Sequence, residues 1–206
     1  MKMGLGNIGL IGRFKPLHNG GALMLEAVCE QAEKVIIGIG SSNKYNLRNP
    51  FTAKETQEMI NLYLHPRFNN YSFLEIPDFG QIPEYAGGQK WTEHILEHYG
   101  KLDHFVSGND HVTKLLKPHY DVIHPATLIP PEQHLWIKGT TVRMEMARGG
   151  DWKSLVPGVV AEYLVQKGLV ERFRKEFGLE TLALLSSGID YRVHEDAETE
   201  QKHTRE

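Results

Sequence analysis

The chain has 206 residues, of which 40% are apolar, so it is long enough to bury one sizeable hydrophobic core but short for two. Its formal net charge of −3 excludes an extended nucleic-acid groove, because binding of phosphate backbones needs a clustered excess of Lys and Arg. No stretch approaches the roughly twenty apolar residues of a membrane helix, and a single cysteine, Cys29, on an apolar helix face fits the reducing cytoplasm.

Apolar runs bounded by turn residues alternate with segments of helical periodicity along the chain. The runs cover residues 7–12, 35–40, 71–76, 104–107 and 121–123. This alternation predicts an α/β fold with a Rossmann-like open parallel sheet flanked by helices. In such a sheet the ligand crevice lies beyond the carboxyl ends of the strands.

The first run leads directly into the segment Gly12-Arg13-Phe14-Lys15-Pro16-Leu17-His18-Asn19-Gly20-Gly21. Two cations, a histidine and paired glycines at a helix start bring positive charge and backbone N–H groups together, so this loop is predicted to bind phosphate. The later segment Lys138-Gly139-Thr140-Thr141-Val142-Arg143 has the same character. Two anion sites in one domain predict a polyphosphate substrate that is bound from both sides.

Further polar loops are expected at the same edge of the sheet. They contain Ser41, Ser42, Asn43, Lys44 and Arg48 after the second run, and Gly108, Asn109 and Asp110 after the fourth. Between them, Thr52 and Glu55 form a capping box that predicts a helix start. The apolar stripe of that helix would be Met59, Ile60, Tyr63 and Leu64.

The end of the chain is predicted to be helical over residues 140–147, 157–165 and 169–177. We expect one domain over residues 1–180, with this helical end-piece starting at about 140. The remaining residues, 181–206, form a C-terminal extension that becomes polar and aperiodic from about Glu195 and is expected to be partly disordered.

Two other patterns point to different protein classes. Residues 4–9 match the dinucleotide fingerprint G-x-G-x-x-G, but an apolar run follows them instead of a helix, which argues against a nicotinamide-dependent dehydrogenase. His94, Glu97 and His98 match the zinc signature H-x-x-E-H and would share one helix face, as in a metallohydrolase. The alternative is a solvent-facing helix rich in His and Glu, because a zinc peptidase needs a further acidic ligand and a larger scaffold.

In order along the chain, several segments resemble the motifs of the archaeal-type nicotinamide-nucleotide adenylyltransferases. These segments are residues 12–20, 38–42, 48–52, 107–109, 139–143 and the stretch 151–157 that follows. The family belongs to the nucleotidyltransferases named for an H-x-G-H motif. The resemblance implies transfer of AMP from ATP to nicotinamide mononucleotide (NMN), which gives NAD and pyrophosphate, with Mg²⁺ bound together with ATP.

The resemblance also implies roles for particular residues. His18 would contact the ATP phosphates near the reacting phosphorus, Arg13 and Arg143 would hold phosphate oxygens, and Arg48 would lie near the reacting phosphates. The remaining ATP-binding residues would be Gly12, Phe14, Gly20, Gly139 and Thr140. The acceptor, either NMN or its acid form NaMN, would meet Ser41, Asp78, Trp91, Gly108 and Asn109, with Trp91 stacked on the nicotinamide ring and Asp78 accepting from its amide.

Each of these side chains also has a purely structural interpretation. Those that could complete a turn, a strand exit or a helix cap are His18, Ser41, Asp78 and Asn109. Those that could form surface ion pairs are Arg13 and Arg143. Trp91 could be an aromatic residue of the core.

The chain departs from the family pattern at the second histidine of the motif, which is Gly21. In the family that histidine donates a hydrogen bond to the α-phosphate, so its loss weakens stabilisation of the transition state. Lys15 replaces a glutamine, Lys138 a serine and Thr56 an arginine, and the segment between Asp78 and Trp91 is longer than usual.

We expect Lys15 and Lys138 to compensate for these changes as catalytic cations. The chain would then remain an adenylyltransferase with reduced activity. The alternatives are a nucleotide-binding or regulatory homologue, or an adenylyltransferase that uses another phosphorylated acceptor. The resemblance further implies a homo-oligomer.

Overall fold

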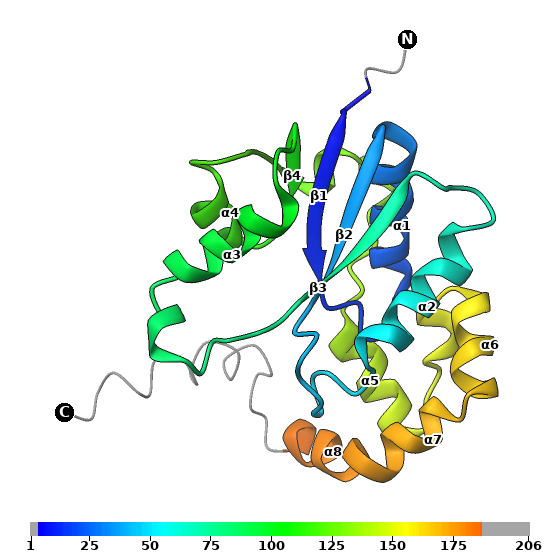
Figure 1. Cartoon of the computed structure of the whole chain (residues 1–206). Helices are drawn as coiled ribbons and strands as arrows, with labels where there is room; N and C mark the ends of the chain where they lie inside the picture. Colours follow the sequence, from blue (N-terminus) through cyan, green and yellow to red (C-terminus); the bar gives the residue numbers. More distant parts are fainter. Residues whose placement is uncertain (1–3, 187–206) are drawn as a thin grey trace.

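Five parallel strands form the sheet in a computed structural model that describes residues 4–186 (Figure 1). They are β1 (Asn7–Gly12), β2 (Lys34–Gly40), β3 (Tyr71–Ile76), β4 (His104–Val106) and β5 (Asp121–Ile123). Each apolar run of the sequence therefore forms a strand as predicted, with small differences at the start of β2 and the end of β4.

The strand order is β3-β2-β1-β4-β5, and every neighbouring pair is parallel. The chain builds outward from β1 to β3 and then crosses back to place β4 on the other side of β1. Leu10 of β1 accordingly has a partner on each side, Ile37 of β2 and Val106 of β4. The order reverses between β1 and β4, and a ligand crevice is expected beyond the carboxyl ends of these two strands.

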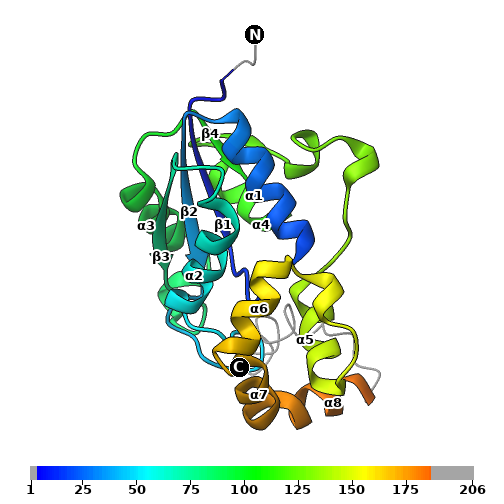
Figure 2. The same ribbon diagram turned by 90° about the vertical axis from the view of Figure 1, so that its right-hand side faces the viewer.

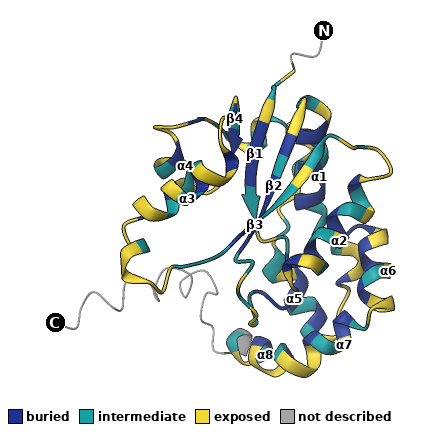
Figure 3. Ribbon diagram, in the orientation of Figure 1, coloured by how far each residue is buried: buried dark blue, intermediate teal, exposed yellow. Residues whose placement is uncertain are grey.

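Helices cover both faces of the sheet, and their buried residues face it (Figure 1, Figure 3). One face carries α1 (Asn19–Gln31) and α2 (Ala53–Leu64), and the other carries α3 (Gln89–Tyr99) and α4 (Asp110–Leu116). Cys29 of α1 is a buried thiol in the first of these layers, and burial raises its pKa to about 12. It is thus the inert core thiol that the sequence predicted.

A glycine in β2 lets α3 approach the sheet closely. A Cβ atom on Gly38 would overlap the hydroxyl group of Tyr99, the last residue of α3. That hydroxyl donates a hydrogen bond of 2.7 Å to the backbone oxygen of Leu10 in β1.

Gly9, the last glycine of the apparent dinucleotide fingerprint, lies inside β1 and not before a helix, so the dehydrogenase interpretation is excluded as predicted.

The start of α2 has the predicted capping box. The Thr52 hydroxyl accepts from the backbone N–H of Glu55 at 3.2 Å, and the Glu55 carboxylate accepts from the N–H of Thr52 at 2.8 Å. Of the predicted apolar stripe, Met59, Ile60 and Leu64 are fully buried and Tyr63 is partly buried. The cap and the stripe together fix where this helix begins and which face it turns to the sheet.

The last part of the described chain forms a helical end-piece below the carboxyl end of β1 (Figure 1, Figure 2). It contains α5 (Gly139–Arg148), α6 (Gly158–Gln166), α7 (Leu169–Phe173), a π-helical turn (Arg174–Gly178) and α8 (Leu179–Ser186). The helix predicted over 169–177 is thus divided after Phe173. Residues 187–206, which include the predicted tail from Glu195, lie outside the described residues.

Short 3₁₀ turns connect the longer elements, at Pro83–Tyr85, Pro125–Thr127, Pro131–Gln133 and Lys153–Leu155. Across residues 4–186, no helix is both long and apolar enough to span a membrane.

Candidate active site

A cavity of about 930 Å³ lies where the loop after β1 meets the start of α5. Its wall contains most of the two predicted phosphate-binding segments, including every residue in them to which a role was assigned: Gly12, Arg13, Phe14, Lys15, His18 and Gly20 from the loop, and Lys138, Gly139, Thr140 and Arg143 at the start of α5. The guanidinium of Arg143 donates to the backbone oxygen of Lys15 at 2.8 Å, which joins segments 128 residues apart in the sequence. The two predicted anion sites therefore form one site.

His18 occupies the N-cap position of α1, where its Nδ1 accepts from the backbone N–H of Gly21 at 3.1 Å. Burial and the nearby charge of Arg143 lower the pKa of His18 to about 4, so the ring is neutral at pH 7. Since Nδ1 accepts, the single ring proton lies on Nε2, which is left as a donor. The structural interpretation of His18 and the phosphate-binding one are thus compatible, because they use different nitrogen atoms.

Arg143 is only 5% exposed, so it is not a surface residue. Besides its bond to Lys15, it donates to the Thr140 hydroxyl at 3.3 Å. These bonds hold the guanidinium at the first turn of α5, where unpaired backbone N–H groups already favour an anion. The start of α5 therefore combines a fixed cation with helical N–H groups.

Lys15 lines the cavity but is almost fully buried. Its side chain is 2% exposed, and Nζ donates to the backbone oxygen of Ser41 at 2.9 Å. Burial and the charge of Arg13 lower the pKa of Lys15 to about 8. The ammonium group thus connects the loop after β1 to the loop after β2, where Ser41 has a φ of +51°. Lys138, in contrast, is exposed at the N-cap position of α5.

The predicted acceptor residues Ser41 and Asp78 lie together at the ends of β2 and β3, outside the wall of the cavity. The Ser41 hydroxyl donates to Asp78 Oδ2 at 3.4 Å, while Asp78 Oδ1 accepts from the backbone N–H of Gly80 at 2.9 Å. Asn43 adds two bonds to the Asp78 backbone, at 2.7 and 3.0 Å. Asp78 therefore does shape a turn, and the Ser41 carbonyl connects this pair to Lys15.

The other acceptor predictions are spread over neighbouring elements. Trp91 is half-buried on α3 and packs against the core on that face, in agreement with its structural interpretation. Asn109 caps α4, because its Oδ1 accepts from Val112 N–H at 3.0 Å. Gly108 lies closer to the cavity, since a Cβ atom there would be 3.6 Å from Nε2 of the cavity residue His124.

Arg48 is not in the cavity wall either. It belongs to the turn 46–49, where its backbone N–H donates to Asn46 Oδ1 at 3.1 Å. The structure thus brings the predicted ATP residues together, whereas Arg48 and most of the predicted acceptor residues lie beside that site.

Sequence reasoning missed a whole wall of the cavity, which the segment after β5 provides. Its lining residues are His124, Pro125, Ala126, Ile129, His134, Leu135, Trp136 and Ile137. His124 Nδ1 accepts from Ala126 N–H at 3.2 Å, so its Nε2 is a donor by the same argument as for His18. The signal was available, because the fifth strand ends at the same edge of the sheet as the first.

Gly20 is required by this wall. A Cβ atom at Gly20 would lie 2.8 Å from the backbone oxygen of Leu135, which cannot move aside as a side chain can. At Gly21 the nearest atoms to such a Cβ would be 3.5 Å or more away, which is ordinary contact. The missing histidine of the motif has therefore left space for a side chain next to the cavity.

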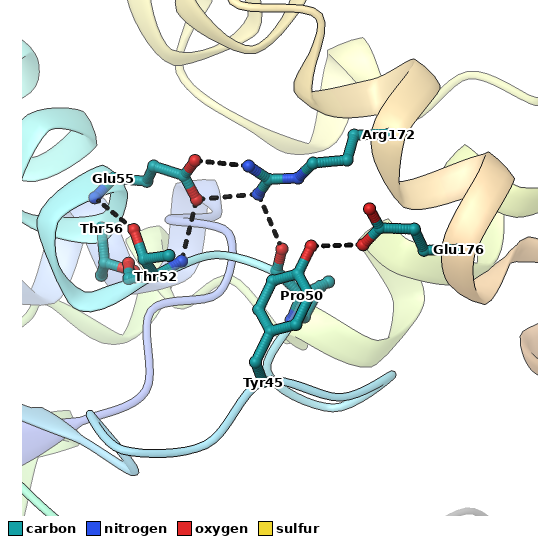
Figure 4. A network of polar contacts seen from close by, with 7 residues as sticks. All are labelled: Tyr45, Pro50, Thr52, Glu55, Thr56, Arg172 and Glu176. Carbon is teal, nitrogen blue, oxygen red and sulfur yellow. Dashed lines mark hydrogen bonds and ion pairs between the residues drawn. The ribbon is translucent and has the colours of Figure 1, made fainter.

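Arg172 of α7 is a second residue that the sequence did not single out. It donates to both carboxylate oxygens of Glu55, at 2.6 and 2.8 Å, and to the backbone oxygen of Pro50 at 2.9 Å (Figure 4). Tyr45 lies under its guanidinium and donates to Glu176. Burial alone would raise the pKa of Glu55, but the bonds from Arg172 and the α2 cap outweigh it and hold the pKa below its usual value.

Thr56, where the family pattern has an arginine, follows Glu55 of this network in the sequence. Thr56 is fully buried and donates to the backbone oxygen of Thr52 at 2.9 Å. The guanidinium beside Glu55 comes from Arg172, 117 residues later. The end-piece thereby fixes the loop that contains Arg48 (Figure 4).

His94, Glu97 and His98 do share one face of α3, as their spacing predicted. Their ligand atoms all lie within 4.8 Å of one another. None of the three lines the cavity of about 930 Å³. The metallohydrolase interpretation therefore has its three residues in place, but on the opposite side of the sheet from α1 and α2.

Comparison with known proteins gives a consistent picture. Residues 10–144 match the family described as cytidylyltransferase-like. The chain is 32% identical over 166 residues to the nicotinamide-nucleotide adenylyltransferase of Thermococcus onnurineus, which covers 80% of this chain and 84% of the relative. It is 33% identical over 182 residues to the enzyme of the same name from Pyrococcus furiosus, covering 84% and 88%.

Among solved structures, the chain resembles a bifunctional NMN adenylyltransferase/ADP-ribose pyrophosphatase from Francisella tularensis, in complex with AMP and a manganese ion. The TM-score is 0.65 at 18% identity, over 90% of this chain and 57% of the other. This chain thus spans little more than half of that bifunctional protein. The similarity confirms the Rossmann-like fold, and the matches to the archaeal proteins confirm the resemblance that the motifs indicated.

Proposed function

This chain belongs to the cytidylyltransferase-like family, and we propose that it acts there as a nicotinamide-nucleotide adenylyltransferase. It transfers the adenylyl group of ATP to the phosphate of NMN or NaMN and releases pyrophosphate. The observation that carries this proposal is that His18 and the start of α5, from two distant motifs, line one cavity. The names of the relatives, at about a third identity over most of the chain, support the choice of acceptor.

The chemistry needs little more than these groups. An oxygen of the acceptor phosphate attacks the α-phosphorus of ATP, and the bond to the leaving pyrophosphate breaks. Since the nucleophile is already an anion, no general base is required, and the protein positions the reactants and stabilises developing charge. His18 donates from Nε2 near the α-phosphate, while Thr140, Lys138 and the N–H groups of α5 hold the β- and γ-phosphates.

The wall that the sequence did not predict has the character of a nucleobase site. It contributes apolar and aromatic side chains, of which Trp136 is 89% exposed. An aromatic face stacks on any base, so this segment is suited to the adenine ring. The adenosine would thus lie against residues 124–137, with its phosphates toward the loop after β1.

The divalent cation enters with the nucleotide in this proposal. None of the described residues that line the cavity is an Asp or Glu, so the wall offers no carboxylate ligand for Mg²⁺. Mg²⁺ commonly keeps several waters and binds through substrate phosphates, and MgATP is then the substrate. The manganese ion in the Francisella structure is compatible with such a role.

Because Gly21 has no side chain to donate a hydrogen bond to the α-phosphate, other residues must stabilise the charge that develops there. The Lys15 ammonium is bound to the Ser41 carbonyl, so in this proposal its main part is to position the loop. Lys138, exposed at the start of α5, and His124, whose Nε2 is a donor, are the residues that compensate. Arg13 and Arg143 provide the remaining positive charge. Ser41, Asp78 and Trp91 form an acceptor region at the side, reached through the loop after β2.

The loss of the motif histidine also favours a second candidate, a homologue that binds nucleotides without transferring AMP. A third is an adenylyltransferase with another phosphorylated acceptor, because the segment between Asp78 and Trp91 is unusually long. We further propose that residues 1–180 form the catalytic domain and that the protein acts in the cytoplasm as a homo-oligomer, without a nucleic-acid or membrane partner.

Release of pyrophosphate distinguishes these functions. The protein would be incubated with MgATP and NMN, NaMN or no acceptor, and the nucleotide products would be separated. The adenylyltransferase predicts NAD or its acid form in amounts equal to pyrophosphate, and neither without acceptor. ATP binding without pyrophosphate release in any reaction would instead identify a nucleotide-binding homologue.

A further inference from the structure

We propose that His94, Glu97 and His98 of α3 form a binding site for a divalent transition-metal ion of the kind that imidazole favours, such as Zn²⁺, Ni²⁺ or Cu²⁺. The proposal does not depend on the adenylyltransferase function. It concerns a face of α3 outside the cavity, and the metal would not take part in adenylyl transfer.

The three side chains have the right composition and spacing. Residues at i, i+3 and i+4 lie on one helix face, and their ligand atoms here are within 4.8 Å of one another. Zn²⁺ holds imidazole nitrogens at about 2.0–2.1 Å, so bound ligand atoms must lie somewhat closer together than this. Glu97 and His98 are exposed and can rotate to close the gap, with water completing the coordination.

His98 is oriented as metal-binding histidines usually are. Its Nδ1 lies 2.8 Å from the backbone oxygen of His94, so Nδ1 carries the proton and donates it. The lone pair of Nε2 is then directed outward. A backbone carbonyl that fixes the tautomer in this way is a common outer partner of a metal-bound histidine.

His94 has a polar atom that the protein itself does not satisfy. Within residues 4–186, its Nε2 is buried and makes no hydrogen bond. The ring packs against His98, with centroids 4.0 Å apart, and meets the edge of Phe79 at 6.1 Å. An unsatisfied buried nitrogen is costly, and a metal ion would relieve that cost.

A bound ion would also fix the surroundings of this face. Phe79 contacts both His94 and Tyr85, which lies in the segment that precedes α3. Trp91 lies one turn before His94 on the same helix. A chelate that joins positions i and i+4 would therefore stiffen α3 and the segment next to it.

Titration of metal-free, nucleotide-free protein tests the proposal. Zn²⁺ in competition with a chromophoric chelator should bind at one ion per chain and raise the melting temperature, because it binds only the folded protein. His98→Ala, an exposed position, should weaken binding by about tenfold or more, and Glu97→Gln by less. His119→Ala, an exposed histidine after α4, is the matched control and should bind as the unmodified protein does.

Two results would overturn the proposal. One is no binding of Zn²⁺ or Ni²⁺ by the unmodified protein. The other is equal affinity in His98→Ala and the unmodified protein, which would place the metal on other histidines of the chain. A Cu²⁺ spectrum with two nitrogen ligands that becomes a one-nitrogen spectrum in His98→Ala would support it independently of stability.

Discussion

His18 illustrates how one residue serves fold and chemistry at once. Its Nδ1 caps α1, which requires the neutral ring, and the same residue lines the cavity with Nε2 as its remaining donor. The pKa of about 4 that burial and Arg143 impose keeps the ring neutral across the physiological range. A cation at this position would lose the cap, because a protonated ring has no acceptor.

The pH dependence of stability follows from that pKa. Between pH 6.5 and about 4 the unfolded chain binds a proton at residue 18 that the folded chain does not, so stability is complete above pH 6.5 and falls as the pH drops. We expect His18 to account for about 2 kcal/mol of the loss in unfolding free energy between pH 7 and pH 5. Urea denaturation of His18→Gln should lack this part of the loss.

The exposed His119→Gln variant serves as the control and should retain the full pH dependence. An unchanged pH dependence in His18→Gln would mean that His18 is protonated in the folded protein, and the cap that its Nδ1 gives to α1 would then be ruled out.

Substitution of Gly21 by histidine is expected to increase the activity of the protein. A Cβ atom at this position would have only ordinary contacts, and the residue lines the cavity, so a side chain can begin here without a backbone clash. Gly21→His restores the donor that the family motif provides. We expect turnover to rise by about tenfold with little change in the KM for ATP, since the new bond would form in the transition state.

Steady-state rates of Gly21→His and Gly21→Ala separate this effect from a change in the helix. Gly21→Ala should leave turnover near that of the unmodified protein. A fall in turnover for the histidine variant, with the melting temperature unchanged, would show that Lys138 and His124 already supply the hydrogen bonds that the new histidine would provide.

At the scale of the elements, α7 is connected to the start of α2 by the pair of Arg172 and Glu55. Each partner is partly buried, with side-chain exposures of 29% and 18%, and the contact is bidentate. With this geometry, the pair should contribute measurably to the free energy of unfolding, whereas fully exposed ion pairs contribute little. The same arginine also reaches Pro50 in the loop that contains Arg48.

Arg172→Met should lower the free energy of unfolding by about 2–3 kcal/mol, because it leaves the partly buried Glu55 without its partner. Urea denaturation measures the change. Arg148→Met removes the pair of a more exposed arginine, at 57%, with Glu145 three residues away, and should cost less than about 1 kcal/mol. Equal losses of unfolding free energy in the two variants would mean that the burial of Arg172 adds nothing to the stability.

The elements show clearly what the sequence predicts and what it does not. The strands, the capping box at Thr52 and the two loops that line the cavity were predictable because their signals are local: alternation of runs, a cap three residues from its partner, and glycines beside cations. Arg172 was not predictable, since it meets Glu55 only after the chain has returned to α2. The bond from Lys15 to Ser41 was missed for the same reason, because nothing local shows where a buried ammonium group is directed.

For the whole molecule, the topology explains the position of the site. The strand order reverses between β1 and β4, and the cavity opens at the carboxyl end of β1. The end-piece brings α5 to that edge, so that one nucleotide can be held by the first and the last motifs (Figure 1). The aromatic segment after β5 completes the wall, and its place could have been inferred from the strand order alone.

In the proposed mechanism, Lys138 at the start of α5 stabilises the transition state of adenylyl transfer, and the Lys138→Ala variant is the decisive test of this role. NAD formation should show a fall in kcat of about a hundredfold with the KM for NMN nearly unchanged, because the charge acts on the leaving phosphates. Lys117→Ala, an exposed lysine after α4, should behave as the unmodified protein does. An unchanged kcat, or equal losses in kcat and in acceptor binding, would contradict the account.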